Sequence, residues 1–110
     1  MALYQTLDKA MEARDAETYI NHLHDDFTFV RHQSGETMDK AAMAEMVRRM
    51  MASDKMAIRD QRLIYENDDI LVEHSVMDFP DGTSEAVMGV HTLKDGKILR
   101  TETGATLLKK

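Results

Sequence analysis

The stretch that most constrains the fold is residues 89–104, with the sequence GVHTLKDGKILRTETG. Two runs typical of β-strands flank Asp95-Gly96, a dipeptide that readily adopts the positive φ angles of a tight hairpin turn. The pattern therefore predicts a β-hairpin. We expect this hairpin to be the last pair of strands in a strongly bent sheet, around which the rest of the chain is arranged.

The composition is that of a small folded protein, and it excludes several functions. With 110 residues, 43% of them hydrophobic, we expect a single domain over residues 1–110 with one modest core. The net charge of −6 argues against binding to nucleic acid or to anionic membranes, because both need a basic surface. The absence of cysteine excludes disulfides, thiolate metal sites and cysteine nucleophiles.

The sequence shows no pattern of a targeting or membrane segment. Its first residues lack the basic region and apolar core of a signal peptide. No apolar run approaches the roughly 20 residues that span a bilayer. We therefore expect a cytoplasmic protein.

Three helices are predicted in the first half of the chain. Residues 2–13 carry apolar side chains at helical spacing. Asp15 is a suitable N-cap for a second, short helix that His22 and His24 would close. Asp39 can cap a third helix, whose apolar stripe consists largely of methionines. We interpret this stripe as core packed on the sheet; a flexible cavity wall is compatible with it.

The strands predicted around these helices give the element order ααβαββββ. A first strand covers residues 27–31. Four sequential antiparallel strands follow the third helix, at residues 56–66, 70–79, 84–93 and 97–108. This order is that of an α+β domain with its helices on one face of a curved sheet.

The element order, together with three segments of the sequence, resembles a known group of proteins. The segments are RDAETY at 14–19, HDDFTF at 24–29 and GVHTLKDGKI at 89–98. They resemble the nuclear transport factor 2-like superfamily and, within it, the SnoaL-like (polyketide cyclase-like) group. The resemblance implies a cone-shaped, strongly bent, mostly antiparallel sheet closed by three helices, and a homodimer packed sheet to sheet. It also implies a cavity inside the cone, which in such proteins serves isomerases, cyclases, dehydratases, epoxide hydrolases or plain binding.

The catalytic residues of the ketosteroid isomerase-like branch are not matched. Its general base corresponds to Arg31, which cannot accept a proton at neutral pH. A slip by one residue would put His32 there, but it would turn Phe27 and Phe29 away from the cavity. The oxyanion-hole tyrosine corresponds to Leu7, which cannot donate a hydrogen bond.

The epoxide hydrolase-like branch is not matched either. In that branch an Arg and an Asp on the second long strand meet an Asp on the last strand. The corresponding positions here are His74, Val76 and Thr103, so neither carboxylate is present. The resemblance therefore implies neither of these two enzymes.

Strand alternation predicts which side chains line the cavity if Arg31 faces inward. Such a cavity would be apolar with a few polar groups, as small-molecule sites usually are. The expected ligand-binding residues are Phe29, Arg31, Val72, Glu85, Val87, His91, Thr101 and Thr103, with Leu99 and Ala105 on the same strand as the threonines.

The polar members of this set allow two interpretations. In the first, Arg31 anchors a carboxylate or another anion, and His74 is a catalytic acid or base with His91 or Glu85 beside it. In the second, Arg31 pairs with Glu85 or Glu102, and both histidines are hydrogen-bonded in a dry wall or a dimer face. No tight ligand spacing such as His-Glu-x-x-His occurs, so we expect no metal and no other cofactor.

The function that we expect is binding of a small, partly apolar molecule by a homodimeric, cone-shaped domain, with an anionic group on the ligand as one option. A SnoaL-like isomerase, cyclase or lyase that uses His74 for acid–base chemistry is an alternative. A non-catalytic module whose exposed sheet face binds another protein is a further one. Residues that could contribute to such a face are Leu71, Met77, Phe79 and Met88.

Overall fold

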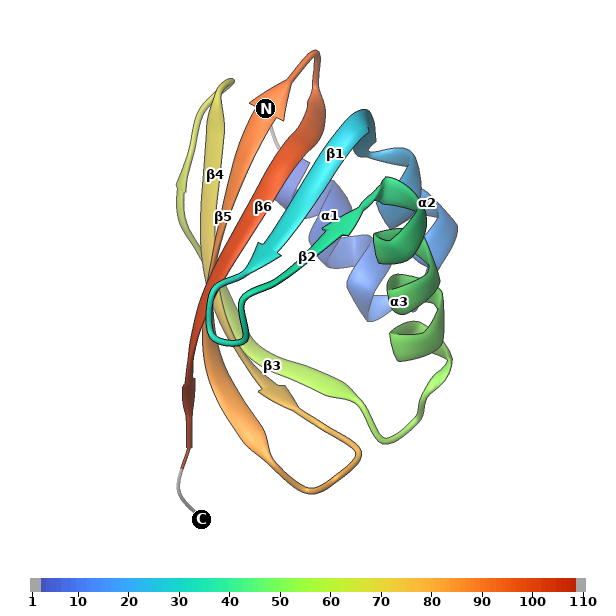
Figure 1. Cartoon of the computed structure of the whole chain (residues 1–110), viewed down its shortest axis with the longest axis vertical. Helices are drawn as coiled ribbons and strands as arrows, with labels where there is room; N and C mark the ends of the chain where they lie inside the picture. Colours follow the sequence, from blue (N-terminus) through green and yellow to red (C-terminus); the bar gives the residue numbers. More distant parts are fainter. Residues whose placement is uncertain (1–2, 109–110) are drawn as a thin grey trace.

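The structure is a computed structural model, and it describes residues 3–108. Over these residues a curved, unclosed sheet of six strands carries three helices on one face (Figure 1). The helices are α1 (Leu3–Glu12), α2 (Ala16–Asn21) and α3 (Lys40–Ala52). The strands are β1 (Leu23–Arg31), β2 (Glu36–Asp39), β3 (Ala57–Glu66), β4 (Ile70–Asp78), β5 (Ser84–Lys94) and β6 (Lys97–Leu107). The predicted α+β fold is confirmed. No helix in the described part is long and apolar enough to cross a membrane.

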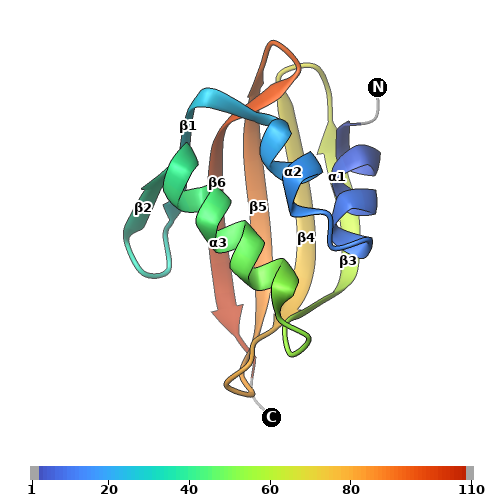
Figure 2. The same ribbon diagram turned by 90° about the vertical axis from the view of Figure 1, so that its right-hand side faces the viewer.

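The strands lie in the order β2-β1-β6-β5-β4-β3. From β3 to β6 they form the predicted antiparallel series, whereas β1 pairs with β6 in parallel and with β2 in antiparallel. Figure 2 shows the helices in front of the sheet, with α3 lying diagonally across its middle. One face of the sheet is therefore covered by helices, and the other face is not.

The predicted hairpin joins β5 to β6. Asp95 and Gly96 both have positive φ, 54° and 76°, and Lys94 lies opposite Lys97 across the turn. A two-residue turn of this kind fixes the register of its strands.

The two predicted helix caps are also present. The Asp15 carboxylate accepts a hydrogen bond from the backbone N–H of Thr18 at 3.2 Å, and the Asp39 carboxylate accepts one from Ala42 at 2.9 Å. Each carboxylate satisfies a donor that has no partner within its helix.

The junction between α2 and β1 differs from the prediction. The helix ends at Asn21, so that His22 is its C-cap and His24 lies in the strand. The strand begins at Leu23, four residues earlier than predicted, because Leu23 pairs with Ile98 of β6. Both of these side chains are fully buried, which ties the start of β1 to the core.

A short strand was missing from the predicted order, which becomes ααββαββββ. Glu36–Asp39, the strand β2, pairs with the second half of β1, where no strand was predicted. Three of its four side chains are exposed. Its conformation therefore depends on backbone pairing with β1, and no alternation of apolar and polar residues marks it in the sequence.

The core lies between the sheet and the helices. Leu23, Leu71 and Ile98 are its largest fully buried side chains. Met43 and Val47 of α3 are buried in the same cluster, so part of the predicted methionine stripe is indeed core.

Candidate functional site

A cavity of about 610 Å³ lies between α3 and the covered face of the sheet. It is lined on the helix side mainly by methionines and on the sheet side by residues of β1, β4, β5 and β6. Seven of the ten methionines take part: Met11, Met38, Met43, Met46, Met50, Met51 and Met77. The methionine stripe of α3 is thus both core and cavity wall, and the wall is built from flexible, polarizable side chains.

A chain of buried polar side chains lies in the sheet wall of this cavity. The Nε2 atom of His91 is 2.5 Å from Oε2 of Glu73, and its Nδ1 atom is 2.7 Å from the Thr101 hydroxyl. The other carboxylate oxygen of Glu73 accepts a hydrogen bond of 2.7 Å from the Gln61 amide. The side chain of His91 is 3% exposed and that of Glu73 is 18% exposed. Glu73 is therefore the member of the pair that a molecule in the cavity would touch.

The partners of Glu73 decide its charge. Burial by itself would raise the pKa of this carboxyl, but the hydrogen bond and positive charge of His91 and the hydrogen bond of Gln61 outweigh burial, and the pKa lies below the usual 4.5. Glu73 is therefore ionised at neutral pH.

Tyr19 adds a neutral hydroxyl to the same cavity from α2. Burial raises the pKa of this phenol above its usual value, and the negative charge of Glu73 raises it further. Tyr19 thus stays protonated at neutral pH, so its hydroxyl is able to donate a hydrogen bond.

The side chains of β4 face the opposite way from the prediction. In the register between β4 and β5, Glu73 lies opposite Gly89 and Ser75 opposite Val87, and all four line the cavity. Residues that lie directly opposite one another share a face of the sheet.

The predicted catalytic residue His74 consequently lies on the uncovered face, opposite Met88, and Val72 lies there opposite Val90. Neither lines the cavity. The expectation that His74 and Val72 face inward was therefore wrong.

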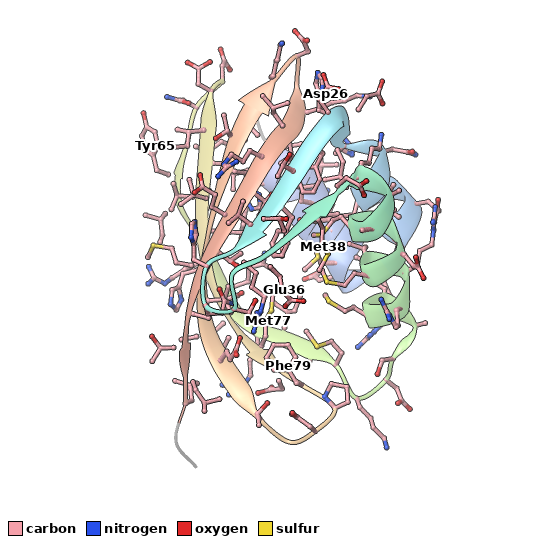
Figure 3. All side chains as sticks on the ribbon, in the orientation of Figure 1. Asp26, Glu36, Met38, Tyr65, Met77 and Phe79 are labelled. Atoms are coloured by element: carbon pink, nitrogen blue, oxygen red, sulfur yellow. The ribbon has the colours of Figure 1, made fainter. Side chains whose placement is uncertain are left out.

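The prediction of the outer face was wrong for the same reason, because the side chains of β4 face the opposite way. Leu71 is fully buried, and Met77 and Phe79 line the cavity. Figure 3 shows Met77 and Phe79 on the side of the helices and Tyr65 on the opposite side. Of the four residues expected on the outer face, only Met88 is there, 44% exposed.

Most of the other expected residues do line the cavity. These are Phe29, Arg31, Val87, His91, Thr101 and Thr103. Leu99 and Ala105 do not line it; the register between β5 and β6 shifts beside Leu99.

Glu85 is not in the lining, but it contacts a residue that is. Its carboxylate lies 3.3 Å from the Arg31 guanidinium, whose side chain is 30% exposed. The pairing of Arg31 with Glu85 matches one of the two interpretations of the sequence. The roles expected of these residues in ligand binding stay predictions.

A second hollow of about 400 Å³ lies beside α1 and the start of β3. It shares four lining residues with the larger cavity: Met11, Met50, Met51 and Gln61. Charged groups such as Asp8 and Arg14 line the rest of it, and the Arg14 guanidinium is held by the backbone carbonyls of Ser53 and Met56. Among residues 3–108 no group of three His, Asp or Glu side chains is arranged to hold a metal ion.

The sequence reasoning missed Glu73, Gln61 and Tyr19. The sequence did contain a hint that Glu73 faces inward, because Leu71, Met77 and Phe79 lie on the same face of the strand as Glu73. The opposite face carries two valines, however, so hydrophobicity alone does not show which face of β4 is turned toward the core. For Gln61 the sequence contained no signal, because its orientation depends on an irregularity of β3.

Comparison with protein families settles the classification. The profile of the SnoaL-like domain matches residues 4–101. The chain belongs to the SnoaL-like domain family. The resemblance seen in the sequence is confirmed, while no protein with a curated description matches the chain significantly.

Solved structures similar to this SnoaL-like domain share its fold at low sequence identity. A ketosteroid isomerase-like protein from Kribbella flavida has a TM-score of 0.81 at 14% identity, covering 99% of this chain and 78% of that one. An NTF2-like protein of unknown function from Cytophaga hutchinsonii has a TM-score of 0.76 at 13% identity, with 94% and 87% covered. An LEH-like epoxide hydrolase from M. tuberculosis has a TM-score of 0.69 at 15% identity, with 94% and 79% covered. At these identities the likeness shows the fold alone.

Proposed function

We propose that this SnoaL-like domain binds a small, mostly apolar molecule in the cavity under α3. The observation that carries the proposal is the Glu73–His91 pair in the wall of an otherwise largely apolar space. Burying a carboxylate costs free energy that a hydrophobic pair would not, so such a pair is poor evidence for stability and good evidence for a use. The cavity volume of about 610 Å³ lies within the range of small-molecule sites.

The methionine wall and Arg31 bear on the kind of ligand. Flexible thioether side chains adapt to differently shaped apolar ligands and make favourable contacts with aromatic rings. Arg31 reaches Glu85 only at 3.3–3.4 Å, whereas strong charge-assisted hydrogen bonds are about 2.7–2.9 Å long. Its guanidinium is therefore available to a carboxylate or another anionic group on the ligand.

A thermal-shift screen tests this proposal. The probes are aromatic and alicyclic carboxylic acids, each paired with its neutral amide, on the wild type, Arg31→Ala and the control Arg48→Ala. Arg48 pairs with Glu17 and does not line the cavity. A ligand at 100 times its Kd adds about 2.7 kcal/mol, or a rise in Tm on the order of 10 °C for a domain of this size.

We expect acids to raise the Tm of the wild type and of Arg48→Ala more than that of Arg31→Ala. If amides and acids act equally on all three proteins, the anion site at Arg31 is wrong, while the cavity remains a binding site. If no probe raises the Tm of any of them, the binding proposal itself loses its support.

A second candidate function is proton transfer on the bound molecule, as in an isomerase, cyclase or lyase. The favouring observation is that Glu73 and His91 both line the cavity, and that the side chain of Glu73, 18% exposed, is more accessible than that of His91, 3% exposed. Glu73 would accept a proton from carbon next to a carbonyl, and Tyr19 would donate a hydrogen bond to the resulting enolate oxygen. Glu73 takes here the role of base that the sequence gave to His74.

Deuterium exchange tests this second function. NMR in D₂O would follow loss of the α-proton of a carbonyl probe that the thermal-shift screen identified. We expect exchange with the wild type and none above background with Glu73→Gln, which keeps the shape of the side chain but cannot act as a base. Equal exchange with both proteins would exclude Glu73 as the base.

For the partner, the proposal is a second copy of this chain packed against the uncovered face of the sheet. Tyr65 is 55% exposed and Met88 is 44% exposed, and the register places Val72, Val76 and Val90 on the same face. An apolar strip of this kind is typical of an interface. Sedimentation velocity of the wild type and of Met88→Glu tests this proposal.

A further inference from the structure

The strand β3 contains an irregularity beside Glu73. Arg59 lies opposite Val76 and Arg62 lies opposite His74, so that Asp60 and Gln61 together face the single residue Ser75. This arrangement, two residues against one, is a β-bulge.

The bulge includes a residue with an unusual backbone. Asp60 has φ = +54°, in the left-handed region where a residue other than Gly costs roughly 1 kcal/mol or more. Strained residues of this kind and bulges are both found preferentially near functional sites, where a bulge can re-aim a side chain.

Alternation shows what the extra residue does. Side chains of a strand alternate between the two faces, and one inserted residue exchanges the faces of all that follow. If the same residues continued without a bulge, Asp60 would lie opposite Ser75, Gln61 opposite His74 on the outer face, and Arg62 opposite Glu73. With it, Gln61 points into the cavity and Arg62 lies opposite His74 on the outer face. The bulge therefore gives Glu73 a neutral amide as its neighbour in place of a guanidinium.

We propose that the bulge makes Gln61 a positioning residue for Glu73. The Gln61 amide holds Oε1 of the carboxylate at 2.7 Å while His91 holds Oε2 at 2.5 Å, so that the two donors fix the plane of the group. Among residues 3–108, His91 is then the one ionisable group hydrogen-bonded to the carboxylate, and the proton affinity of Glu73 depends on it. Gln61 does not take part in chemistry itself. This inference rests on the proposed use of Glu73 in the cavity.

The charged and titratable groups around Glu73 come from three other elements. His91 of β5 is its direct partner. Tyr19 of α2 and Tyr4 of α1 both have pKa values raised first by burial and then by negative charge that includes Glu73. A test of Gln61 must leave these three groups in place.

NMR titration of the Glu73 carboxyl supplies that test. The chain is labelled with ¹³C at the glutamate carboxyl, and the resonance is assigned by its loss in Glu73→Gln. The variants are Gln61→Met, which has similar length and no amide, and Asp60→Gly, which keeps the bulge and relieves its strain. Gln33→Met is the matched control, because Gln33 also lines the cavity but its amide oxygen contacts Thr103 instead.

We expect the titration midpoint of Glu73 to rise in Gln61→Met, since one hydrogen bond to the ionised form is lost. It is expected to stay at the wild-type value in Asp60→Gly and Gln33→Met. An unchanged midpoint in Gln61→Met, or an equal rise in Gln33→Met, would overturn the proposal.

A substitution tests the bulge by a change in the opposite direction. Gln61→Arg puts at the inward position the guanidinium that a strand without the bulge would place opposite Glu73, so the midpoint is expected to fall below the wild-type value. A midpoint equal to that of the wild type in Gln61→Arg would overturn the role given to the bulge.

These measurements also separate the inference from the proposed function. If the midpoint moves as expected but no ligand binds and no proton exchanges, Gln61 is a positioning residue and the function is wrong. If ligands bind and exchange occurs in the wild type while the midpoint is the same in Gln61→Met, only the positioning role is wrong.

Discussion

The two faces of the sheet at β4 and β5 each carry a histidine, in very different environments. On the covered face Glu73 is paired with His91 and Gln61 beneath the helices. On the uncovered face His74 lies opposite Met88. The environment of a histidine in this protein therefore depends on which face of the sheet it occupies, because the helices cover one face only.

The largest expected difference between the faces concerns the two histidines. His91→Ala leaves the largely buried carboxylate of Glu73 without its hydrogen-bond partner, which should cost about 3–5 kcal/mol of the free energy of unfolding. His74→Ala, the matched control on the uncovered face, should change it by about 0.5 kcal/mol or less. Urea unfolding at pH 7 measures both. Equal losses would show that the two faces do not differ as described.

Two neighbouring apolar residues of β4 sharpen the same comparison. Leu71 is fully buried, and Leu71→Ala should cost about 2–5 kcal/mol through lost burial and the cavity left behind. Val72→Ala, one position further on the uncovered face, should cost about 1 kcal/mol. The same urea experiment measures both variants. A larger loss of stability for Val72→Ala would show that Val72, and not Leu71, faces the core.

The third prediction concerns how the free energy of unfolding changes as the pH falls. The folded-state pKa of Glu73 is below 4.5, because the contacts with His91 and Gln61 outweigh the rise caused by burial. A lowered carboxyl pKa contributes stability that is present above the unfolded pKa and is lost as the pH falls through the folded one. The difference between wild type and Glu73→Gln should therefore be largest at neutral pH and shrink below about pH 4.5. A difference that grows on acidification would contradict the assigned direction.

The smallest effect on the stability of one chain is expected on the uncovered face. Met88→Glu places a charge at a position that is 44% exposed, and should change the free energy of unfolding of the monomer by about 0.5 kcal/mol or less. It should nevertheless dissociate the proposed dimer, since the same residue would be buried in the interface. Sedimentation velocity of wild type and variant at equal concentration measures this. A wild type that is already monomeric would rule out the proposed partner.

Much of the fold could be predicted because its signals are local. The Asp95-Gly96 turn and the Asp15 and Asp39 caps depend on a few neighbouring residues and were all confirmed. The strand β2 could not be predicted, because its few residues are mostly exposed and pair only through the backbone of β1.

The candidate site was predicted in part, and whether a residue was placed correctly depended on how firmly its strand pair fixes the register. Between β5 and β6 the tight hairpin sets the register, so His91, Thr101 and Thr103 were correctly placed in the cavity. Between β4 and β5 a longer turn leaves the register open, and the prediction was displaced by one residue. That single shift exchanged Glu73 for His74.

Patterns along the chain were enough to predict most of the helices and strands, the hairpin and the family. The tertiary structure alone decided which groups meet in the cavity. The phase of β4 and the bulge at Asp60 come from the pairing of β4 with β3 and β5, and a shift of one residue in either reverses the face of every side chain concerned. The Glu73–His91–Gln61 cluster exists because three strands bring residues 61, 73 and 91 together on the face of the sheet that the helices cover.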